Sequence, residues 1–186
     1  CFIPSDRIEA GTYLAAATIT NGCITINKVD PNRLENILSK LRLCGADIQT
    51  TKESVSIKMN SDINPVDIQT LPFPGFPTDM QAQFTVINAL SKGSSVITEN
   101  VFENRFMHVQ ELVRMGCNIS IQGKNAFIQG VKAITGAQVM ATDLRASACL
   151  ILAGLCAEGE TIVDRIYHID RGYERIEEKL SYLGAN

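Results

Sequence analysis

The stretch that decides the fold begins at Thr78 and ends at Gln129, and it reads TDMQAQFTVINALSKGSSVITENVFENRFMHVQELVRMGCNISIQGKNAFIQ. Gly93 marks a turn between a first helical segment and a β-rich run, and Gly116 ends a second helical segment. Two further runs with strand character close the stretch. It therefore predicts a helix, a strand, a second helix and two strands, in that order.

The same order of elements is predicted for residues 8–58, and residues 142–186 begin it again but stop before the two closing strands. Each unit has a turn glycine after its first helix, an arginine 11 or 12 positions later, and a glycine that ends its second helix. These markers are Gly22, Arg33 and Gly45, then Gly93, Arg105 and Gly116, then Gly159, Arg171 and Gly184. Because these markers recur in the same order and at nearly the same spacing, they indicate an internal threefold repeat, with units of about 1–62, 65–131 and 132–186.

The two helical segments of a unit differ in polarity. Leu14–Ile19 and Ala146–Ala157 are apolar almost all round, whereas Glu174–Lys179 has a polar face. Because helices without a polar face are buried on every side, we expect an α/β fold with buried helices, outer sheets and a pseudo-threefold axis. The third unit lacks its closing strands, and an open sheet edge is a liability. We therefore expect a segment absent from this chain to complete it.

Local signals place several helix ends. Asp30 before Pro31 predicts a helix start, and Thr78 with Gln81 fits a capping box. Asp170 is expected to cap the last helix. The glycines that end the second helices are expected in the left-handed conformation.

Composition limits the class of protein. The chain has 186 residues, 45% hydrophobic content and a net charge of −3, which suits one domain and argues against a broad nucleic-acid surface. No apolar run reaches the roughly 18 to 20 residues of a membrane span. The six cysteines form no CxxC pair and are expected to be ordinary core thiols in a reducing cytoplasm. Because the first residue is Cys1 rather than Met, we expect the interior of a longer chain.

Charged residues recur where helices are expected to begin. Asp79 and Asp143 each follow a threonine at the start of a first helix. Arg105 and Arg171 are expected to open second helices. Helix N-termini attract anions, and guanidinium groups bind phosphate or carboxylate with paired bonds. Together with Arg145 these residues predict an anion pocket, in which Asp79 is free to act as a base if the preceding threonine caps its helix.

Each of these residues also has a plainer interpretation. Asp79 and Asp143 could be helix caps only, and the arginines could be solvated or paired at the surface. Arg33, the first-unit counterpart of the other helix-opening arginines, is expected to be solvated. His108 and His168 have no partner at metal or triad spacing and are expected to be structural. No metal site and no cofactor are predicted.

Four longer stretches are specific enough to compare with a known family. They are residues 73–83 (FPGFPTDMQAQ), 99–108 (ENVFENRFMH), 141–147 (ATDLRAS) and 163–174 (VDRIYHIDRGYE). All four resemble the UDP-N-acetylglucosamine enolpyruvyl (1-carboxyvinyl) transferases, and the likeness runs from about residue 3 to residue 186. The resemblance implies two similar domains of inside-out α/β barrel type with the active site between them. This chain would be most of one domain, and the second would be absent.

The resemblance also implies an activity. The family transfers the enolpyruvyl group of phosphoenolpyruvate to the 3′-hydroxyl of UDP-N-acetylglucosamine and releases phosphate, the first committed step of peptidoglycan synthesis, which serves the cell wall, cell shape and cell division. Asp79 would be the base beside that hydroxyl, and Asp143 would support proton movement. The substrate-binding residues that the resemblance implies are Asp79, Val101, Phe102, Arg105, Leu144, Arg145 and Arg171.

Some family features are missing, and alternatives stay open. The family's proton-donating cysteine or aspartate lies on a mobile loop of the other domain, no cysteine here lies in a matching loop, and the hinge lysine is absent. We therefore expect no turnover from this chain alone. The alternatives are the shikimate-branch enolpyruvyl transferase, which shares the fold, and a non-catalytic binding module derived from the family. The stretches around Asp79 and Arg105 favour the cell-wall enzyme, and the retained aspartate and arginines argue against a pure scaffold.

Overall fold

The structure is a computed structural model that describes residues 3–185. Its α-helices are α1 (Arg7–Ile19), α2 (Glu35–Leu43), α3 (Gln81–Ala89), α4 (His108–Arg114), α5 (Leu144–Cys156) and α6 (Ile176–Tyr182). Short 3₁₀ helices are η1 (Pro31–Arg33), η2 (Thr78–Met80) and η3 (Ile166–Arg171). The strands are β1 (Cys23–Asn27), β2 (Asp47–Thr50), β3 (Ser54–Lys58), β4 (Ile68–Gln69), β5 (Ser94–Thr98), β6 (Asn118–Gln122), β7 (Asn125–Gln129), β8 (Gln138–Met140) and β9 (Ile162–Asp164).

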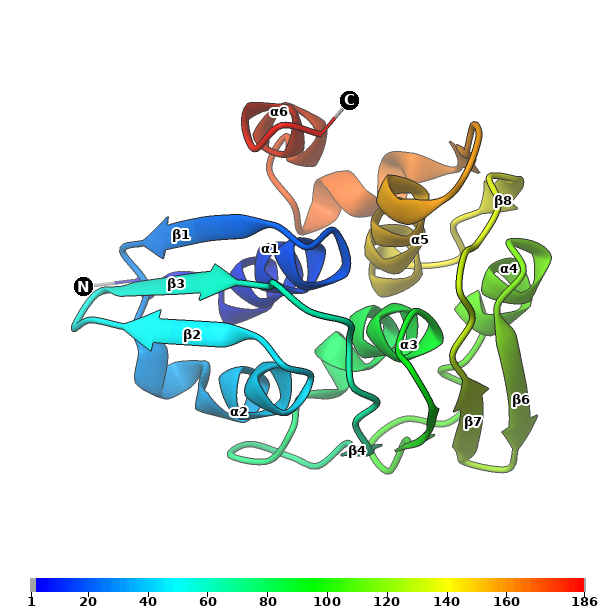
Figure 1. The fold of residues 1–186 in the computed structure, drawn as a ribbon, viewed down its shortest axis with the longest axis horizontal. Helices are drawn as coiled ribbons and strands as arrows, with labels where there is room; N and C mark the ends of the chain where they lie inside the picture. The colour runs from blue at the N-terminus through cyan, green and yellow to red at the C-terminus, as the bar shows by residue number, and fades with distance from the viewer. Residues whose placement is uncertain (1–2, 186) are drawn as a thin grey trace.

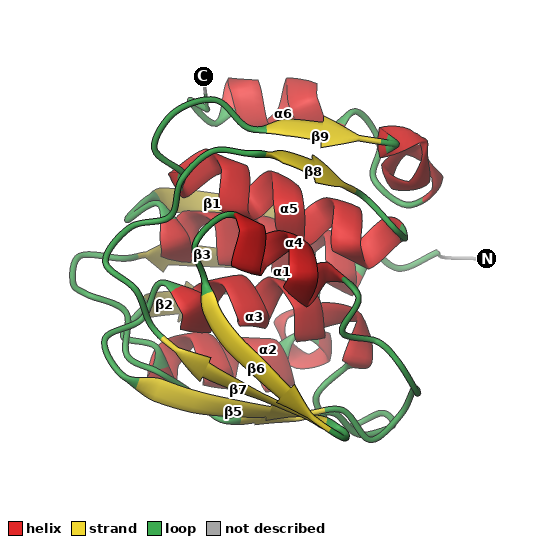
Figure 2. Ribbon diagram, turned by 90° about the vertical axis from the view of Figure 1, so that its right-hand side faces the viewer, coloured by secondary structure: helices red, strands yellow, loops and turns green. Residues whose placement is uncertain are grey.

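The helices α1, α3 and α5 pack against one another at the centre of the molecule, between the sheets (Figure 2). Every residue of α3 is buried, as is every residue of α1 from Ala10 to Ile19. This confirms the predicted burial on all sides for Leu14–Ile19. For α5 the prediction holds only in part, because its last turn, Gly154–Cys156, is half-buried. Leu14, Phe84 and Leu150 are fully enclosed. Truncating one of them to alanine would cost about 2–5 kcal/mol, because a well-packed core cannot close the cavity that is left.

Within residues 3–185 the strands form three sheets, which lie outside the central helices (Figure 1). The first sheet has the order β1-β3-β2 and is antiparallel. The second has the order β4-β5-β7-β6, with β4 parallel to β5 and the other pairs antiparallel. The third pairs β8 and β9 in parallel, and among the described residues no strand pairs with the other edge of β9. Each sheet therefore covers a different side of the central helices.

The helices α2, α4 and α6 each bury one face and leave the other to solvent. In α2 the buried residues are Ile37, Leu38 and Leu41, at helical spacing. The glycine that follows each of these helices has a positive φ: 104° at Gly45, 95° at Gly116 and 97° at Gly184. These values confirm the predicted left-handed helix ends, which allow the chain to turn directly from helix into strand after α2 and α4.

The helix starts differ from expectation in two places. Asp30 caps as predicted, since its carboxylate accepts from Asn32 N at 3.0 Å, although it starts η1 and α2 begins only at Glu35. The capping box at Thr78 is wrong, because that hydroxyl donates to a glutamate side chain elsewhere, and η2 precedes α3. Asp170 does not cap the last helix either: it lies inside η3, and α6 starts after Arg175, which has a φ of 46°.

The thiols are less uniformly buried than expected. Cys44, Cys117 and Cys149 are buried and Cys156 is half-buried, but Cys23 on the sheet-edge strand β1 is exposed. Cys1 lies outside the described residues. No helix in the range 3–185 is long and apolar enough to cross a membrane.

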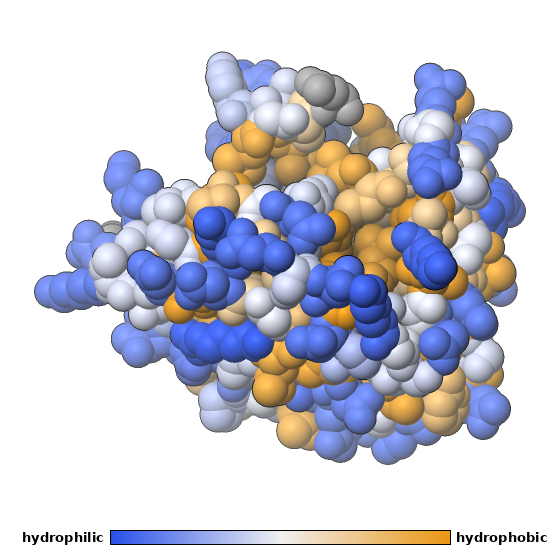
Figure 3. Space-filling view, viewed as in Figure 1, coloured by the Kyte–Doolittle hydropathy of each residue, from blue (hydrophilic) through white to orange (hydrophobic). Residues whose placement is uncertain are grey.

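Apolar side chains also reach the surface between α6 and β1 (Figure 3). A groove of about 500 Å³ lies there, lined among others by Tyr13, Ala17, Leu155, Leu180 and Leu183. It is separate from the polar hollow described next, with which it shares no lining residue.

Candidate active site

A shallow polar hollow of about 550 Å³ collects residues from four segments far apart in the sequence. Its lining residues are Asp79, Phe102, Glu103, Asn104, Arg105, Asp143, Leu144, Arg145, His168 and Arg171. Of the site residues predicted from the sequence, all but Val101 line it. Val101 lies in the adjoining loop and lines a neighbouring hollow together with Phe102 and Arg105.

The centre of the hollow is a carboxylate held between two guanidinium groups. Asp79 Oδ1 accepts from Arg105 Nη2 at 2.8 Å and lies 3.3 Å from Arg145 Nε. The exposed fraction of the side chain is 40% for Asp79 but only 21% for Arg105 and 17% for Arg145. The two cations are thus more enclosed than the anion that lies between them.

The charges around Asp79 keep its carboxyl group ionised. Partial burial raises its pKa, but the guanidinium groups of Arg145 and Arg105 outweigh burial and hold the pKa below its ordinary value. Asp79 lies in η2, two residues before the first residue of α3, and Thr78 does not cap α3. The prediction that Thr78 caps the helix and so leaves Asp79 available was therefore wrong in its first part. Neither residue caps α3, and the Asp79 carboxylate contacts the two arginines instead.

Asp143 is a helix cap in this structure. Its Oδ1 accepts from Arg145 N at 2.7 Å and from Ala146 N at 2.9 Å, which satisfies two free N–H groups at the start of α5. The plainer interpretation therefore holds for this oxygen. Asp143 is nevertheless exposed and lines the hollow, so its carboxylate also places negative charge on the wall of the hollow.

The two arginines expected to open helices are placed differently. Arg105 lies in a turn three residues before α4, and Arg171 is the last residue of η3, before Gly172. Neither is a helix N-terminal residue, so that expectation was wrong for both. Both still reach the hollow, because the turn at Asn104 has a φ of 54° and η3 returns the chain toward α5.

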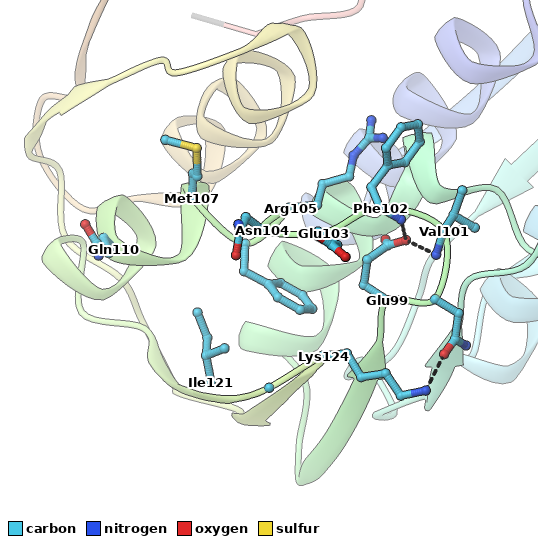
Figure 4. Close-up of a pocket in the computed structure, with 13 residues that line it drawn as sticks. Glu99, Val101, Phe102, Glu103, Asn104, Arg105, Met107, Gln110, Ile121 and Lys124 are labelled. Carbon is cyan, nitrogen blue, oxygen red and sulfur yellow. Dashed lines mark hydrogen bonds between the residues drawn. The ribbon is translucent and has the colours of Figure 1, made fainter.

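One buried glutamate, which the sequence reasoning missed as a site residue, holds the loop that carries Val101 and Phe102. Glu99 is 3% exposed, and its Oε1 accepts from Val101 N at 2.9 Å and Phe102 N at 3.1 Å (Figure 4). Thr70 donates to the same oxygen at 2.8 Å, and Thr78 donates to Oε2 at 2.9 Å. A buried carboxylate with four donors is fully satisfied, and it fixes the loop against the start of α3.

The side chains of this loop separate the two hollows. Figure 4 shows Phe102 and Arg105 side by side, pointing away from Ile121 and Lys124. The guanidinium carbon of Arg105 lies 4.7 Å from the centre of the Phe102 ring, a cation–π contact. On the other side of the loop is a hollow of about 730 Å³, lined partly by Met107, Ile121 and Lys124.

His108 lies behind the hollow and is fully buried. The pKa of its imidazole is lowered to about 4, chiefly by burial, with Asp143 opposing the shift and Arg105 adding to it. Among residues 3–185 its Nε2 atom has no hydrogen-bond partner. It is therefore neutral at pH 7, as a structural histidine would be. Across the described part of the chain, no group of three or more His, Cys, Asp or Glu residues is placed to hold a metal ion.

Comparison with known proteins gives consistent results. The family model described as EPSP synthase (3-phosphoshikimate 1-carboxyvinyltransferase) matches residues 1–180. A UDP-N-acetylglucosamine 1-carboxyvinyltransferase of Klebsiella pneumoniae subsp. pneumoniae is 58% identical over 182 residues, which are 97% of this chain and 43% of that protein. The chain thus spans less than half the length of such relatives.

Solved structures show the same fold. The enolpyruvyl transferase NikO from Streptomyces tendae superposes with a TM-score of 0.88 at 26% identity, over 99% of this chain and 44% of that one. An EPSP synthase from Acinetobacter baumannii superposes with a TM-score of 0.67 at 19% identity, over 88% of this chain and 40% of that one. The mixed α/β architecture is therefore of the EPSP synthase type.

Proposed function

The chain belongs to the EPSP synthase (3-phosphoshikimate 1-carboxyvinyltransferase) family, and we propose that it forms one wall of the active site of an enolpyruvyl transferase. The donor is phosphoenolpyruvate and the acceptor is the 3′-hydroxyl of UDP-N-acetylglucosamine, with phosphate as the second product. The choice of acceptor rests on the 58% identity to a protein of that name. The reaction would be the first committed step of peptidoglycan synthesis, in the cytoplasm.

The observation that carries this proposal is the pairing of Asp79 with Arg105 and Arg145 in one hollow. An enolpyruvyl transfer needs a base at the attacking hydroxyl and cations for the phosphate and carboxylate of the donor. Asp79 can serve as the base, and the two cations, Arg105 and Arg145, lie within 3.3 Å of its Oδ1 atom. Arg171, exposed on the same wall, adds a third cation.

The chemistry follows from these charges. The acceptor oxygen attacks C2 of phosphoenolpyruvate while a proton is added to C3, giving a tetrahedral adduct. Loss of a proton from C3 and cleavage of the C2–phosphate bond then yield the enol ether and phosphate. In this scheme Asp79 takes the hydroxyl proton. When donor anions engage Arg105 and Arg145, the arginines stabilise Asp79 less, so its pKa rises and it becomes a better base.

The remaining predicted residues receive roles by position. Asp143, beside the hollow, is proposed to assist the proton movements at C3. Val101 and Phe102, on the loop that Glu99 holds, are proposed to contact the UDP-sugar, and Leu144 to form part of the wall beside the donor. The hollow is open on one side, which suits a site that a second domain closes.

We further propose that the domain is an inside-out α/β barrel of three related units, about 1–62, 65–131 and 132–186. The pairing of a buried helix with an outer sheet in α1 with β1-β3-β2, α3 with β4-β5-β7-β6, and α5 with β8-β9 supports this. A second, similar domain would supply the proton-donating loop residue. The 43% coverage of the relatives is consistent with such a partner.

A test of the function compares two acceptors. The product of the complete reading frame, given phosphoenolpyruvate and UDP-N-acetylglucosamine, should release phosphate and yield vinyl proton signals of an enol ether by NMR. Shikimate 3-phosphate is the alternative acceptor that the family's name suggests. Turnover with it alone would reassign the chain to the shikimate branch, and turnover with neither would contradict an enolpyruvyl transferase. Phosphate release by residues 1–186 alone would contradict the one-wall proposal.

A further inference from the structure

A buried tyrosine hydroxyl touches the side of Arg145 that faces away from solvent. Tyr173 is 1% exposed, and its hydroxyl accepts a hydrogen bond from Arg145 Nη1 at 3.3 Å. The guanidinium carbon lies 5.9 Å from the centre of the same ring. We propose that Tyr173 is a positioning residue that orients Arg145 for the donor anion, an inference that rests on the proposed function. The Tyr173 hydroxyl belongs to a chain of hydrogen-bonded hydroxyl groups that ends at Thr12 on α1.

The chain of donors and acceptors has a single consistent direction. Thr12 Oγ1 lies 2.8 Å from Ile8 O, which can only accept, so the Thr12 proton goes there. Thr12 Oγ1 must then accept in its 2.9 Å contact with the Tyr173 hydroxyl. The Tyr173 hydroxyl therefore donates its one hydrogen to Thr12, and its oxygen accepts from Arg145. Gln83 Nε2 adds donors to Thr12 at 3.1 Å and to Tyr173 at 3.4 Å.

Two contacts hold the guanidinium group of Arg145. One Nη1 hydrogen bonds to the Tyr173 hydroxyl, and Nε lies 3.3 Å from Asp79 Oδ1 in an ion pair. Two fixed points on a planar group leave little freedom of rotation. Three N–H groups remain for a ligand, and their direction is set in advance. Pre-ordering of this kind lowers the cost of binding an anion.

The segment that carries Tyr173 packs closely against the start of α5. A Cβ atom on Gly172 would lie 2.8 Å from Leu144 Cδ2, so a larger residue there would have to displace the Leu144 side chain. The hydroxyl chain then joins α1, α3 and α5 at one buried point through Thr12, Gln83 and Arg145. A polar junction in the middle of an apolar core needs every partner, which makes it sensitive to single substitutions.

Tyr13 provides a matched control. It is a second buried tyrosine, 8% exposed, on the same helix as Thr12. Among residues 3–185 its hydroxyl has no hydrogen-bond partner. Removing that hydroxyl therefore costs no hydrogen bond inside the described structure, whereas removing the hydroxyl of Tyr173 leaves Arg145 and Thr12 short of a partner.

The experiment compares Tyr173→Phe with Tyr13→Phe in the product of the complete reading frame. Tyr173→Phe should raise the KM for phosphoenolpyruvate about tenfold, the loss of one hydrogen bond to a charged group, and leave the KM for UDP-N-acetylglucosamine unchanged. Thr12→Val should act in the same direction, and Thr12→Ser, which keeps the hydroxyl, should restore the KM. Tyr13→Phe should change neither KM. Equal effects of the two tyrosine variants, or no rescue by Thr12→Ser, would overturn the proposal.

A second readout separates this proposal from the proposed function. The Nε–Hε signal of Arg145 in NMR spectra of the same protein reports its mobility whether or not the enzyme turns over. It should broaden or shift in Tyr173→Phe and stay unchanged in Tyr13→Phe. Absence of turnover in the wild type would refute the function, while an Arg145 signal that is indifferent to Tyr173→Phe would refute the positioning role. If Tyr173→Phe does not fold, the comparison of Thr12→Val with Thr12→Ser decides in the same way.

Discussion

Thr78 donates its hydroxyl hydrogen to Glu99 Oε2 at 2.9 Å, and through this bond the turn that carries Asp79 is tied to the loop that follows β5. The other oxygen of the same carboxylate accepts from the backbone of Val101 and Phe102. A single buried carboxylate thus fixes two parts of the proposed site relative to each other. The position of Asp79 against the loop depends on Glu99, although Glu99 does not line the Asp79 hollow.

Replacing this carboxylate by an amide should loosen the loop. Glu99→Gln keeps the size of the side chain but turns one acceptor into a donor that faces other donors, at a cost of about 1–3 kcal/mol. We expect a KM for UDP-N-acetylglucosamine raised about tenfold and a lower urea midpoint. Glu53→Gln, in the exposed turn before β3, is the control and should change neither quantity. An unaltered KM in Glu99→Gln would show that the loop does not need this anchor.

Asp79→Asn tests the base directly. The amide oxygen can still accept from Arg105 and lie beside Arg145, so the fold should survive, but the amide cannot take a proton. Turnover should fall by about a hundredfold or more, measured as phosphate release at saturating substrates. Asp47→Asn, an exposed aspartate on β2, should retain full activity. Near-normal turnover of Asp79→Asn would remove this residue from the mechanism.

The pH dependence of stability should carry the signature of His108. Its folded-state pKa of about 4 lies below the ordinary value of 6.5, so the unfolded chain binds the proton more readily. Stability from this group is therefore complete above about pH 6.5 and is lost as the pH falls toward 4, by up to about 3 kcal/mol. Urea unfolding across that range should show this loss in the wild type and much less of it in His108→Phe.

The imidazole itself can be followed by NMR. The chain has two histidines, so His168→Gln leaves one set of imidazole signals. Those signals should stay in the neutral form down to about pH 4 while the protein remains folded. Protonation of folded His108 near its ordinary pKa would show that the imidazole is not enclosed as described.

How much the sequence could predict depends on the distance over which a contact acts. Helix ends set by one residue, such as Gly45 and Gly116, were predicted because a left-handed turn is a local property. The cap at Thr78 failed because a tertiary contact overrode the local pattern: the Thr78 hydroxyl donates to Glu99, 21 residues away. Rules that consider only neighbouring residues cannot include a distant group that competes for the same hydroxyl.

The candidate site shows the same division. The repeat and the resemblance named Asp79, Arg105 and Arg145, and the structure brings these three together. Neither could reveal that Tyr173 meets Thr12, because 161 residues separate them and the contact exists only after three helices pack. No sequence motif marks residues that only support the site in this way, so the sequence alone does not reveal them.

Asp143 allows its two possible roles to be separated by experiment. As a cap it accepts from Arg145 N and Ala146 N, a job that asparagine does equally well and alanine does not. Asp143→Asn should therefore keep the stability of the wild type, while Asp143→Ala should lose about 1 kcal/mol. If Asp143 also moves protons, Asp143→Asn loses turnover without losing stability, by about a hundredfold. Full activity in Asp143→Asn, with reduced stability only in Asp143→Ala, would leave the residue a helix cap and nothing more.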